Sequence, residues 1–270
     1  MGILKCPVCG ETIGIDNNCY VCKNRHSFDI AKEGYVNFLC GGHRAGVLIG
    51  DNKDMACSRQ NFLSKGYFDS LINQIKICLD SFGLNNGCVL DICCGEGYYS
   101  SKLAEYFSYQ FYGFDISKEM VRIAAKKKSP VTYFVANMAH LPINDSSVDI
   151  AFHLFAPFHN DEFSRVLKAG GYLISVIPGR RHLFELKEIM YENAYENDEQ
   201  PPQSDGFALV DTIHVSDTIT LNDSQDIMSL LKMTPYFYHT SDEGKARLSS
   251  LSSLTTEIEF VVLIYKNNKS

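Results

Sequence analysis

One group of residues able to do chemistry surrounds an acid and two glycines. Residues 89–98 read VLDICCGEGY, so an apolar run ends at Asp91, passes Gly95 and Gly97, and leads into a helical pattern. Glycine permits positive φ and lets a ligand approach the backbone closely, and the start of a helix supplies unpaired N–H groups. The segment is therefore typical of a strand-to-helix turn that surrounds a cofactor.

The chemistry of this turn favours a cationic cofactor over a dinucleotide. A dinucleotide fingerprint needs G-x-G-x-x-G, but the third position is Ser100, and Glu96 places negative charge where a diphosphate would lie. S-adenosylmethionine carries a sulfonium and an ammonium and has no phosphate. A site rich in acids and carbonyls suits it, so the turn predicts binding of S-adenosylmethionine.

A second group, of cysteines and one histidine, lies near the N-terminus. Cys6 and Cys9 form one C-x₂-C pair, Cys19 and Cys22 form another, and His26 follows. In a reducing compartment such clustered thiols indicate a tetrahedral zinc site. The ligands are either the four cysteines or Cys6, Cys9, Cys22 and His26, and the spacing leaves both sets open. Four protein ligands close the coordination sphere, so the metal is expected to be structural.

Strands and helices alternate beyond residue 87. Strands are expected at residues 88–94, 111–116, 131–136, 148–155 and 172–177, and helices at 98–107, 117–127 and 161–167. This alternation predicts a Rossmann-like α/β fold, with a parallel sheet covered by helices on both faces. Residues 181–195 look helical as well, and residues 257–265 look like a final strand.

Ligands of such a sheet bind at the carboxyl ends of its strands. Asp115 lies there, about twenty residues after Asp91, where an acid can accept hydrogen bonds from ribose hydroxyls. Asn137 ends the third strand, where its amide could read an adenine edge. We therefore expect Asp91, Asp115 and Asn137 to share one pocket with the glycine turn.

The composition is that of an ordinary globular protein. The chain has 270 residues, of which 45% are hydrophobic and 21% charged. Its apolar stretches are shorter than the roughly 18 residues of a membrane span, and residues 1–6 do not resemble a signal peptide, so a cytoplasmic location is expected. The net charge of −7 argues against a broad nucleic-acid footprint, although basic and aromatic residues alternate between residues 20 and 65.

Five segments together resemble a known family. They are C-x₂-C…C-x₃-H at residues 6–26, FDIAKEGYVN at 28–37, DICCGEGYY at 91–99, PGRRHLFELK at 178–187 and MTP at 233–235. The chain resembles, nearly end to end, the bacterial 23S rRNA guanine-N1 methyltransferases. The resemblance implies a class I methyltransferase sheet, a small N-terminal zinc-binding module that helps hold RNA, and a homodimer whose cleft embraces a 23S rRNA hairpin.

The same resemblance implies roles for individual residues. It favours Cys6, Cys9, Cys22 and His26 as the zinc ligands and leaves Cys19 without that role. It implies cofactor contacts at Phe68, Gly95, Glu96 and His182. The chain departs from the family at Cys93, where glycine is usual, and at Phe68, where tyrosine is common.

The domain organisation that follows has three parts. Residues 1–40 form the zinc-binding module, residues 41–80 a linker with connecting helices, and residues 81–270 the S-adenosylmethionine-dependent domain.

The expected reaction is methyl transfer to N1 of a guanine. That nitrogen carries a proton in the neutral base, so a general base within hydrogen-bond reach is needed. The candidates near strand ends are His153, His159 and His182, with Asp149. Two rival hypotheses remain: a methyltransferase of a small molecule or another RNA, and a non-catalytic RNA-binding protein.

Overall fold

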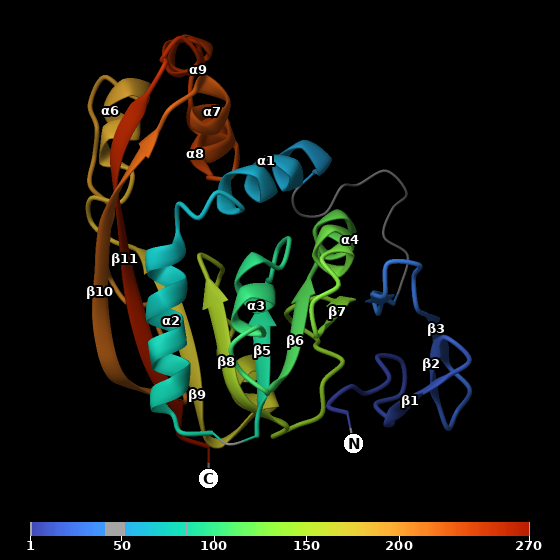
Figure 1. The fold of residues 1–270 in the computed structure, drawn as a ribbon. Coiled ribbons are helices and arrows are strands. Elements are labelled where there is room, and N and C mark those ends of the chain that lie inside the picture. The colour runs from blue at the N-terminus through green and yellow to red at the C-terminus, as the bar shows by residue number, and fades with distance from the viewer. Residues whose placement is uncertain (1, 41–51, 85, 270) are drawn as a thin grey trace.

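The computed structural model describes residues 2–40, 52–84 and 86–269. Its main sheet contains β4 (Val36–Asn37), β5 (Cys88–Ile92), β6 (Gln110–Asp115), β7 (Val131–Val135), β8 (Val148–Leu154), β9 (Leu167–Pro178), β10 (Phe207–Leu221) and β11 (Leu254–Asn267). The spatial order is β10-β11-β9-β8-β5-β6-β7-β4 (Figure 1). The strands from β9 to β4 run parallel, and β11 is antiparallel to both of its neighbours. The predicted α/β fold is confirmed.

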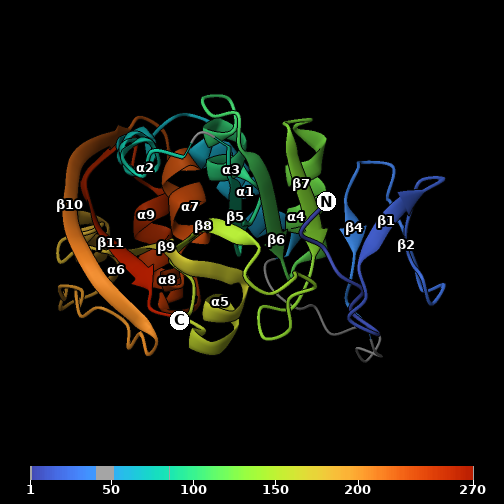
Figure 2. The ribbon, with the colours of Figure 1, turned by 90° about the horizontal axis from the view of Figure 1, so that it is seen from below.

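Helices cover both faces of this sheet. They are α1 (Lys53–Leu63), α2 (Asp69–Ser81), α3 (Tyr98–Leu103), α4 (Lys118–Lys126), α5 (Asn160–Val166), α6 (Phe184–Met190), α7 (Ser224–Lys232), α8 (Tyr236–His239) and α9 (Asp242–Ser249). Helices α2 and α3 lie on one face and α5 on the other (Figure 2). Every residue of β5 is buried, as expected of a parallel strand covered on both sides. Helix α1 passes over the carboxyl ends of the strands (Figure 1).

The chain beyond Pro178 differs from the sequence-based expectation. The helix predicted over residues 181–195 is only α6, because Leu183 adopts a left-handed φ of 58° before it and Tyr191 is extended after it. The 15-residue edge strand β10 was not predicted. Most of its side chains are exposed, so it lacks the apolar pattern that marks a buried strand. The predicted linker starts with residues 41–51, which lie outside the described residues.

The N-terminal module has its own small sheet and is joined to the main one. Strands β1 (Ile13–Asp16), β2 (Cys19–Cys22) and β3 (Ser27–Asp29) form an antiparallel sheet. The module then supplies β4, which pairs with Phe134 and Val135 of β7. The ring of Phe38 packs edge-on against Phe134, with the ring centres 5.9 Å apart. A hydrophobic cluster therefore continues from the module into the main core.

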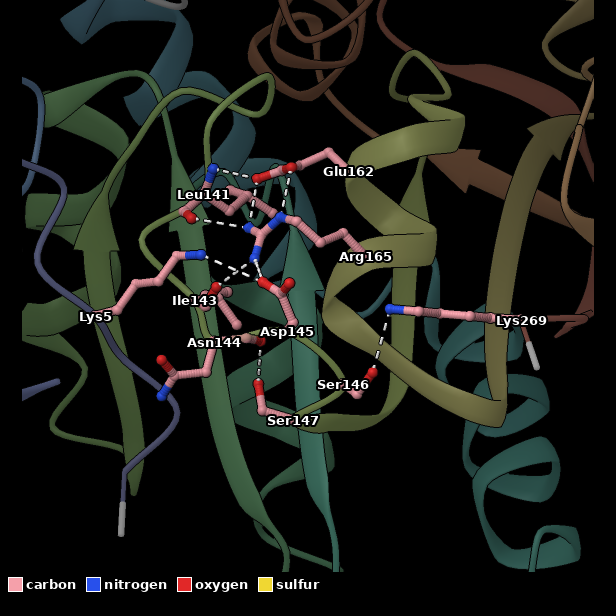
Figure 3. A network of polar contacts seen from close by, with 10 residues as sticks. All are labelled: Lys5, Leu141, Ile143, Asn144, Asp145, Ser146, Ser147, Glu162, Arg165 and Lys269. Carbon is pink, nitrogen blue, oxygen red and sulfur yellow. Dashed lines mark hydrogen bonds and ion pairs between the residues drawn. The ribbon is translucent and has the colours of Figure 1, made fainter. Parts of the chain in front are cut away.

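A polar network centred on Arg165 reinforces this junction (Figure 3). The Arg165 guanidinium binds Glu162 at 2.7 and 2.9 Å, and it also reaches Asp145 and the carbonyls of Leu141 and Ile143. Lys5 of the module donates to the same Asp145 at 3.3 Å. The loop that follows β7 is thereby fixed to α5 and to the N-terminal segment at once.

Replacement of Arg165 by methionine should lower the free energy of unfolding by about 3 kcal/mol, since Glu162 and two carbonyls lose their partner. Denaturant unfolding measures this loss. Lys269→Met is the matched control, because the Lys269 ammonium reaches only the Ser146 hydroxyl, at 3.3 Å, in the described part of this network. A change within about 0.5 kcal/mol is expected for the control, and equal effects of both substitutions would contradict the role of Arg165.

Candidate functional site

A pocket opens where β5 and β8 end. Its lining comes from the turn after β5, from the end of β8, and from α1, α3 and the residue after α7. The lining residues are Arg59, Leu63, Asp91, Cys93, Cys94, Gly95, Glu96, Tyr99, Leu154, Phe155 and Met233. The turn residues Asp91, Gly95 and Glu96, predicted as cofactor contacts, therefore do meet at one cavity.

The glycine turn is shaped by close packing as well as by backbone freedom. Gly95 and Gly97 have φ of +55° and +72°, values that side chains other than glycine rarely adopt. A Cβ at Gly97 would lie 2.6 Å from the Tyr133 hydroxyl and 2.7 Å from the Cβ of Ala124. Gly97 is thus required for α3 to begin this close to β7 and α4.

Asp115 holds the turn in place from the next strand. One carboxylate oxygen accepts the N–H of Gly95 at 3.0 Å, and the other accepts the N–H of Ser117 at 2.8 Å. Asp115 thereby links the end of β6 to the glycine turn and to the start of α4. The predicted placement of Asp115 beside the turn agrees with this geometry.

Asp91 is a buried acid with one carboxylate oxygen that lacks a donor among the described residues. Its side chain is buried, and its Oδ2 has no hydrogen-bond partner among the described residues. Burial raises the Asp91 pKa to about 8. The neighbouring Glu96 is also buried but is paired with Lys127. A ligand ammonium would supply what Asp91 lacks, so the pocket fits the amino-acid end of S-adenosylmethionine.

This arrangement predicts that cofactor binding depends on pH. Below about pH 8 Asp91 is protonated in the free protein, and a cationic ligand must displace that proton. The Kd for S-adenosylhomocysteine, which keeps the ammonium, should therefore fall up to about tenfold per unit as pH rises from 6 to 8. Titration calorimetry at several pH values measures this. In Asp91→Asn the binding should be weaker and its slope flat, and a slope that survives the substitution would contradict the assignment.

Cys93 lies in the same turn with its backbone in the left-handed region, at φ 56°. Its sulfur lies 4.0 Å from that of Met138, and burial raises its pKa to about 12. The left-handed φ explains in physical terms why glycine is usual there in the family that the chain resembles, because glycine has no Cβ penalty at such an angle.

The three candidate histidines have different surroundings. His182 is buried, and its ring lies over that of the pocket residue Phe155, with the centres 6.2 Å apart. Its Nδ1 accepts the N–H of Glu259 at 3.2 Å, so the proton of the neutral ring is on Nε2. Burial lowers the His182 pKa to about 3. The ring is therefore a neutral hydrogen-bond donor at neutral pH.

His153 and His159 lie outside the pocket lining that the described residues form. The His153 ring is buried against Phe158 and Phe163, and burial lowers its pKa to about 4. His159 precedes α5. Asp149 is at the opposite end of β8, where Lys168 pairs with it at 2.6 Å.

This lining also lacks five of the predicted cofactor residues, namely Phe68, Gly97, Asp115, Asn137 and His182. Phe68 is 2% exposed and packs against Phe62 and Phe260. Asn137 follows β7 on the surface, and its side chain accepts the N–H of Ala139. Arg59 and Met233 line the pocket although no cofactor role was predicted for them. They are far from the turn in sequence, and no local spacing could have joined them to it.

The predicted metal ligands converge at the N-terminal module. Cys6, Cys9, Cys22 and His26 place their ligand atoms within 4.8 Å of one another. The Cys9–Cys22 sulfur separation is 3.7 Å, and the His26 Nδ1 lies 3.5 and 3.4 Å from the sulfurs of Cys6 and Cys22. Tetrahedral zinc with Zn–S of about 2.3 Å and Zn–N of about 2.0 Å requires edges of about 3.8 and 3.6 Å. The four residues therefore fit zinc, whereas the Cys19 sulfur instead donates to Asp29 at 3.2 Å.

Comparison with known proteins agrees with both sites. Residues 4–44 match the zinc-ribbon family model described as "RlmA, N-terminal", and residues 89–171 match the model "Methyltransferase domain". The 23S rRNA (guanine(748)-N(1))-methyltransferase of Streptomyces fradiae is 32% identical over 191 residues, which cover 69% of this chain and 67% of the relative. The chain belongs to the 23S rRNA (guanine-N1)-methyltransferase family.

One further relative matches the chain almost from end to end, and another matches about two thirds of it. YxjB of Bacillus subtilis, provisionally named as a 23S rRNA (guanine-N1)-methyltransferase, is 28% identical over 276 residues, covering 97% of this chain and 96% of its own. A Micromonospora griseorubida protein with the same provisional name is 30% identical over 203 residues, covering 68% of each chain.

Membership confirms several expectations drawn from the sequence. As a 23S rRNA (guanine-N1)-methyltransferase family member, the chain is an S-adenosylmethionine-dependent enzyme with a zinc ribbon. Among the described helices, the structure contains none with the length and apolar character of a membrane span.

Proposed function

We propose that this enzyme transfers the sulfonium methyl group of S-adenosylmethionine to N1 of a guanine in a 23S rRNA hairpin. The main support for this proposal is that the zinc-binding module packs against the same sheet that forms the cofactor pocket. A methyltransferase of small molecules needs the pocket but not this module. A non-catalytic RNA-binding protein would need neither the glycine turn nor its two acids.

The residues of the pocket suggest how the cofactor would be held. The Oδ2 atom of Asp91, which lacks a partner among the described residues, would accept from the ammonium, and Asp115 from the ribose hydroxyls, while Gly95 and Glu96 shape the turn between them. Bound there, S-adenosylmethionine supplies an electrophilic methyl group. Cys6, Cys9, Cys22 and His26 would hold a structural zinc ion, with no coordination position left for chemistry.

Phe155 is placed to hold the acceptor base. It lines the pocket directly after β8, and 42% of its surface is exposed. Its φ of 57° is uncommon for an aromatic residue, and such conformations concentrate at functional sites. An exposed ring at this position can stack on a guanine turned out of its loop. The ring of His182 stacks on that of Phe155 and would position it. Because its proton is on Nε2, His182 would donate a hydrogen bond and would not act as the base.

The larger organisation follows the family resemblance. We assign residues 1–40 to zinc binding and RNA contact, 41–80 to the linker and connecting helices, and 81–270 to methyl transfer. We also propose that the enzyme acts in the cytoplasm as a homodimer that receives the hairpin in its cleft.

Transfer of radiolabelled methyl groups tests the proposed substrate class. The acceptors to compare are protein-free 23S rRNA from a strain that lacks the gene, free guanine nucleotides, and a metabolite extract. The proposal predicts label in 23S rRNA alone. Label in a metabolite with unlabelled RNA would establish the small-molecule alternative, and no transfer to any acceptor would favour the non-catalytic one.

A further inference from the structure

Lys187 of α6 is a lysine with no exposed surface. Its ammonium donates to the Tyr195 carbonyl at 3.1 Å and to Oδ1 of Asn197 at 2.6 Å. It also lies over the rings of Tyr195 and Tyr236, at 4.6 and 5.1 Å from their centres. Among the described residues no carboxylate pairs with it. A buried ammonium of this kind is unfavourable for folding. Its presence here therefore suggests a role that an apolar side chain could not fill.

The Asn197 amide connects this ammonium to the turn before α6. Its Oδ1 accepts from Lys187 and, at 3.1 Å, from the Tyr236 hydroxyl. Its Nδ2 donates to the carbonyls of Gly179 and His182, at 2.8 and 3.3 Å. The Asn197 main chain adds a further bond, to the Arg180 carbonyl at 2.8 Å. One side chain thus uses both its acceptor and its donors to fasten residues 179–182.

Two of the groups fastened in this way lie next to residues of the pocket lining, in space or in sequence. One is His182, whose ring lies over the pocket residue Phe155. The other is Tyr236, the first residue of α8, three positions after the pocket residue Met233. The connection passes through Lys187 and Asn197, neither of which lines the pocket that the described residues form.

We infer that Lys187 and Asn197 are positioning residues that set the His182 turn against the cofactor pocket. The ammonium orients the Asn197 amide, because only an oxygen can face Lys187 and Tyr236 while the NH₂ group faces the two carbonyls. Loss of that orientation would free the turn, and with it the ring behind Phe155. This inference rests on the proposed function, since it assumes that the pocket binds S-adenosylmethionine.

Two substitutions separate positioning from stability. Lys187→Met keeps the length of the side chain but removes the ammonium. Asn197→Asp keeps acceptors for Lys187 and Tyr236 but removes both N–H donors to the turn. Lys245→Met is the control, because Lys245 also lies over an aromatic ring, 4.7 Å from the centre of Phe237, but is not bonded to Asn197. The readouts are the Kd for S-adenosylhomocysteine by calorimetry and the unfolding midpoint of the ligand-free protein.

Lys187→Met and Asn197→Asp should each weaken S-adenosylhomocysteine binding about tenfold. The double variant should bind no more weakly than the weaker-binding single variant, as expected of residues that act as a unit. Asn197→Asp should keep the unfolding midpoint of the control. The inference would be overturned if Lys187→Met or Asn197→Asp bound S-adenosylhomocysteine as the wild type does. It would also be overturned if the loss of binding in Asn197→Asp only paralleled a loss of stability. Failure of the wild-type protein to bind S-adenosylhomocysteine would instead overturn the proposed function.

Discussion

Replacement of Cys22 by serine should release zinc and unfold the N-terminal module, whereas Cys19→Ser should retain the metal. The Cys22 sulfur lies 3.7 Å from that of Cys9 and 3.4 Å from His26 Nδ1, as a shared tetrahedral ion requires. The Cys19 sulfur is bonded to Asp29 instead. Structural zinc in small modules is worth about 10–16 kcal/mol of apparent binding free energy, far more than a module of this size gains by burying its own apolar residues.

Zinc content by atomic emission and proteolysis of the purified variants measure the two outcomes. Cleavage after Cys22→Ser should fall within the first 40 residues, and the methyltransferase domain should stay folded but lose the β4 edge of its sheet. Chelation of the wild-type protein should reproduce the Cys22→Ser pattern. Zinc loss in Cys19→Ser as well as in Cys22→Ser would show that the four-cysteine set is the correct one, and zinc retention in Cys22→Ser would contradict both ligand sets.

Gly97→Ala should abolish cofactor binding, with a loss of about 4 kcal/mol in the free energy of unfolding. A left-handed φ costs a non-glycine residue about 1–2 kcal/mol, and overpacking adds about 1–3 kcal/mol. At Gly97 both apply, because the new Cβ would meet the Tyr133 hydroxyl at 2.6 Å. The turn would have to move away from β7, and the pocket residues Gly95 and Glu96 would move with it.

Gly83→Ala is the matched control for this prediction. Gly83 also has a left-handed φ, of +64°, but an added Cβ there meets nothing within 4 Å in the described structure. Its loss should be about 1 kcal/mol, with S-adenosylhomocysteine affinity unchanged. If calorimetry and denaturant unfolding gave the same values for both variants, the close packing of Gly97 against Tyr133 would be excluded as the basis of the effect.

The parallel part of the fold could be predicted because its signals are local. Each strand from β5 to β8 is a short apolar run, and the predicted residues 172–177 are the apolar part of β9, which begins earlier, at Leu167. Ser117 caps α4 by accepting the Met120 N–H, as its position in the sequence suggests. The acids and glycines of the turn follow directly from the end of β5. Site residues that are neighbours in sequence could therefore be predicted from the sequence alone.

Features that depend on distant neighbours were not accessible in this way. The edge strand β10 is exposed along most of its length and is fixed by pairing with β11, not by its own pattern. Arg59 and Met233 reach the pocket from elements before and after the methyltransferase strands. The spacing alone left the choice between Cys19 and His26 open, and the family resemblance favoured His26. In the structure His26 lies beside the sulfurs of Cys6 and Cys22, whereas Cys19 is bonded to Asp29.

The family resemblance predicted cofactor contacts for four residues, but only two of them line the pocket. Gly95 and Glu96 line the pocket, whereas His182 meets it through Phe155 and Phe68 packs behind His182, with ring centres 5.9 Å apart. We therefore expect Phe68 and His182 to act on cofactor and substrate largely through the rings in front of them.

The most direct test of the account is the position of the methyl group in 23S rRNA. Ribosomal RNA from a strain lacking the gene, with and without a plasmid copy, can be cut into fragments and read by mass spectrometry. The account predicts one guanine of a 23S rRNA hairpin, methylated at N1 only when the gene is present and unmethylated with the Asp91→Asn copy. Identical modification in all three samples, or a methyl group that appears on another atom, would contradict it.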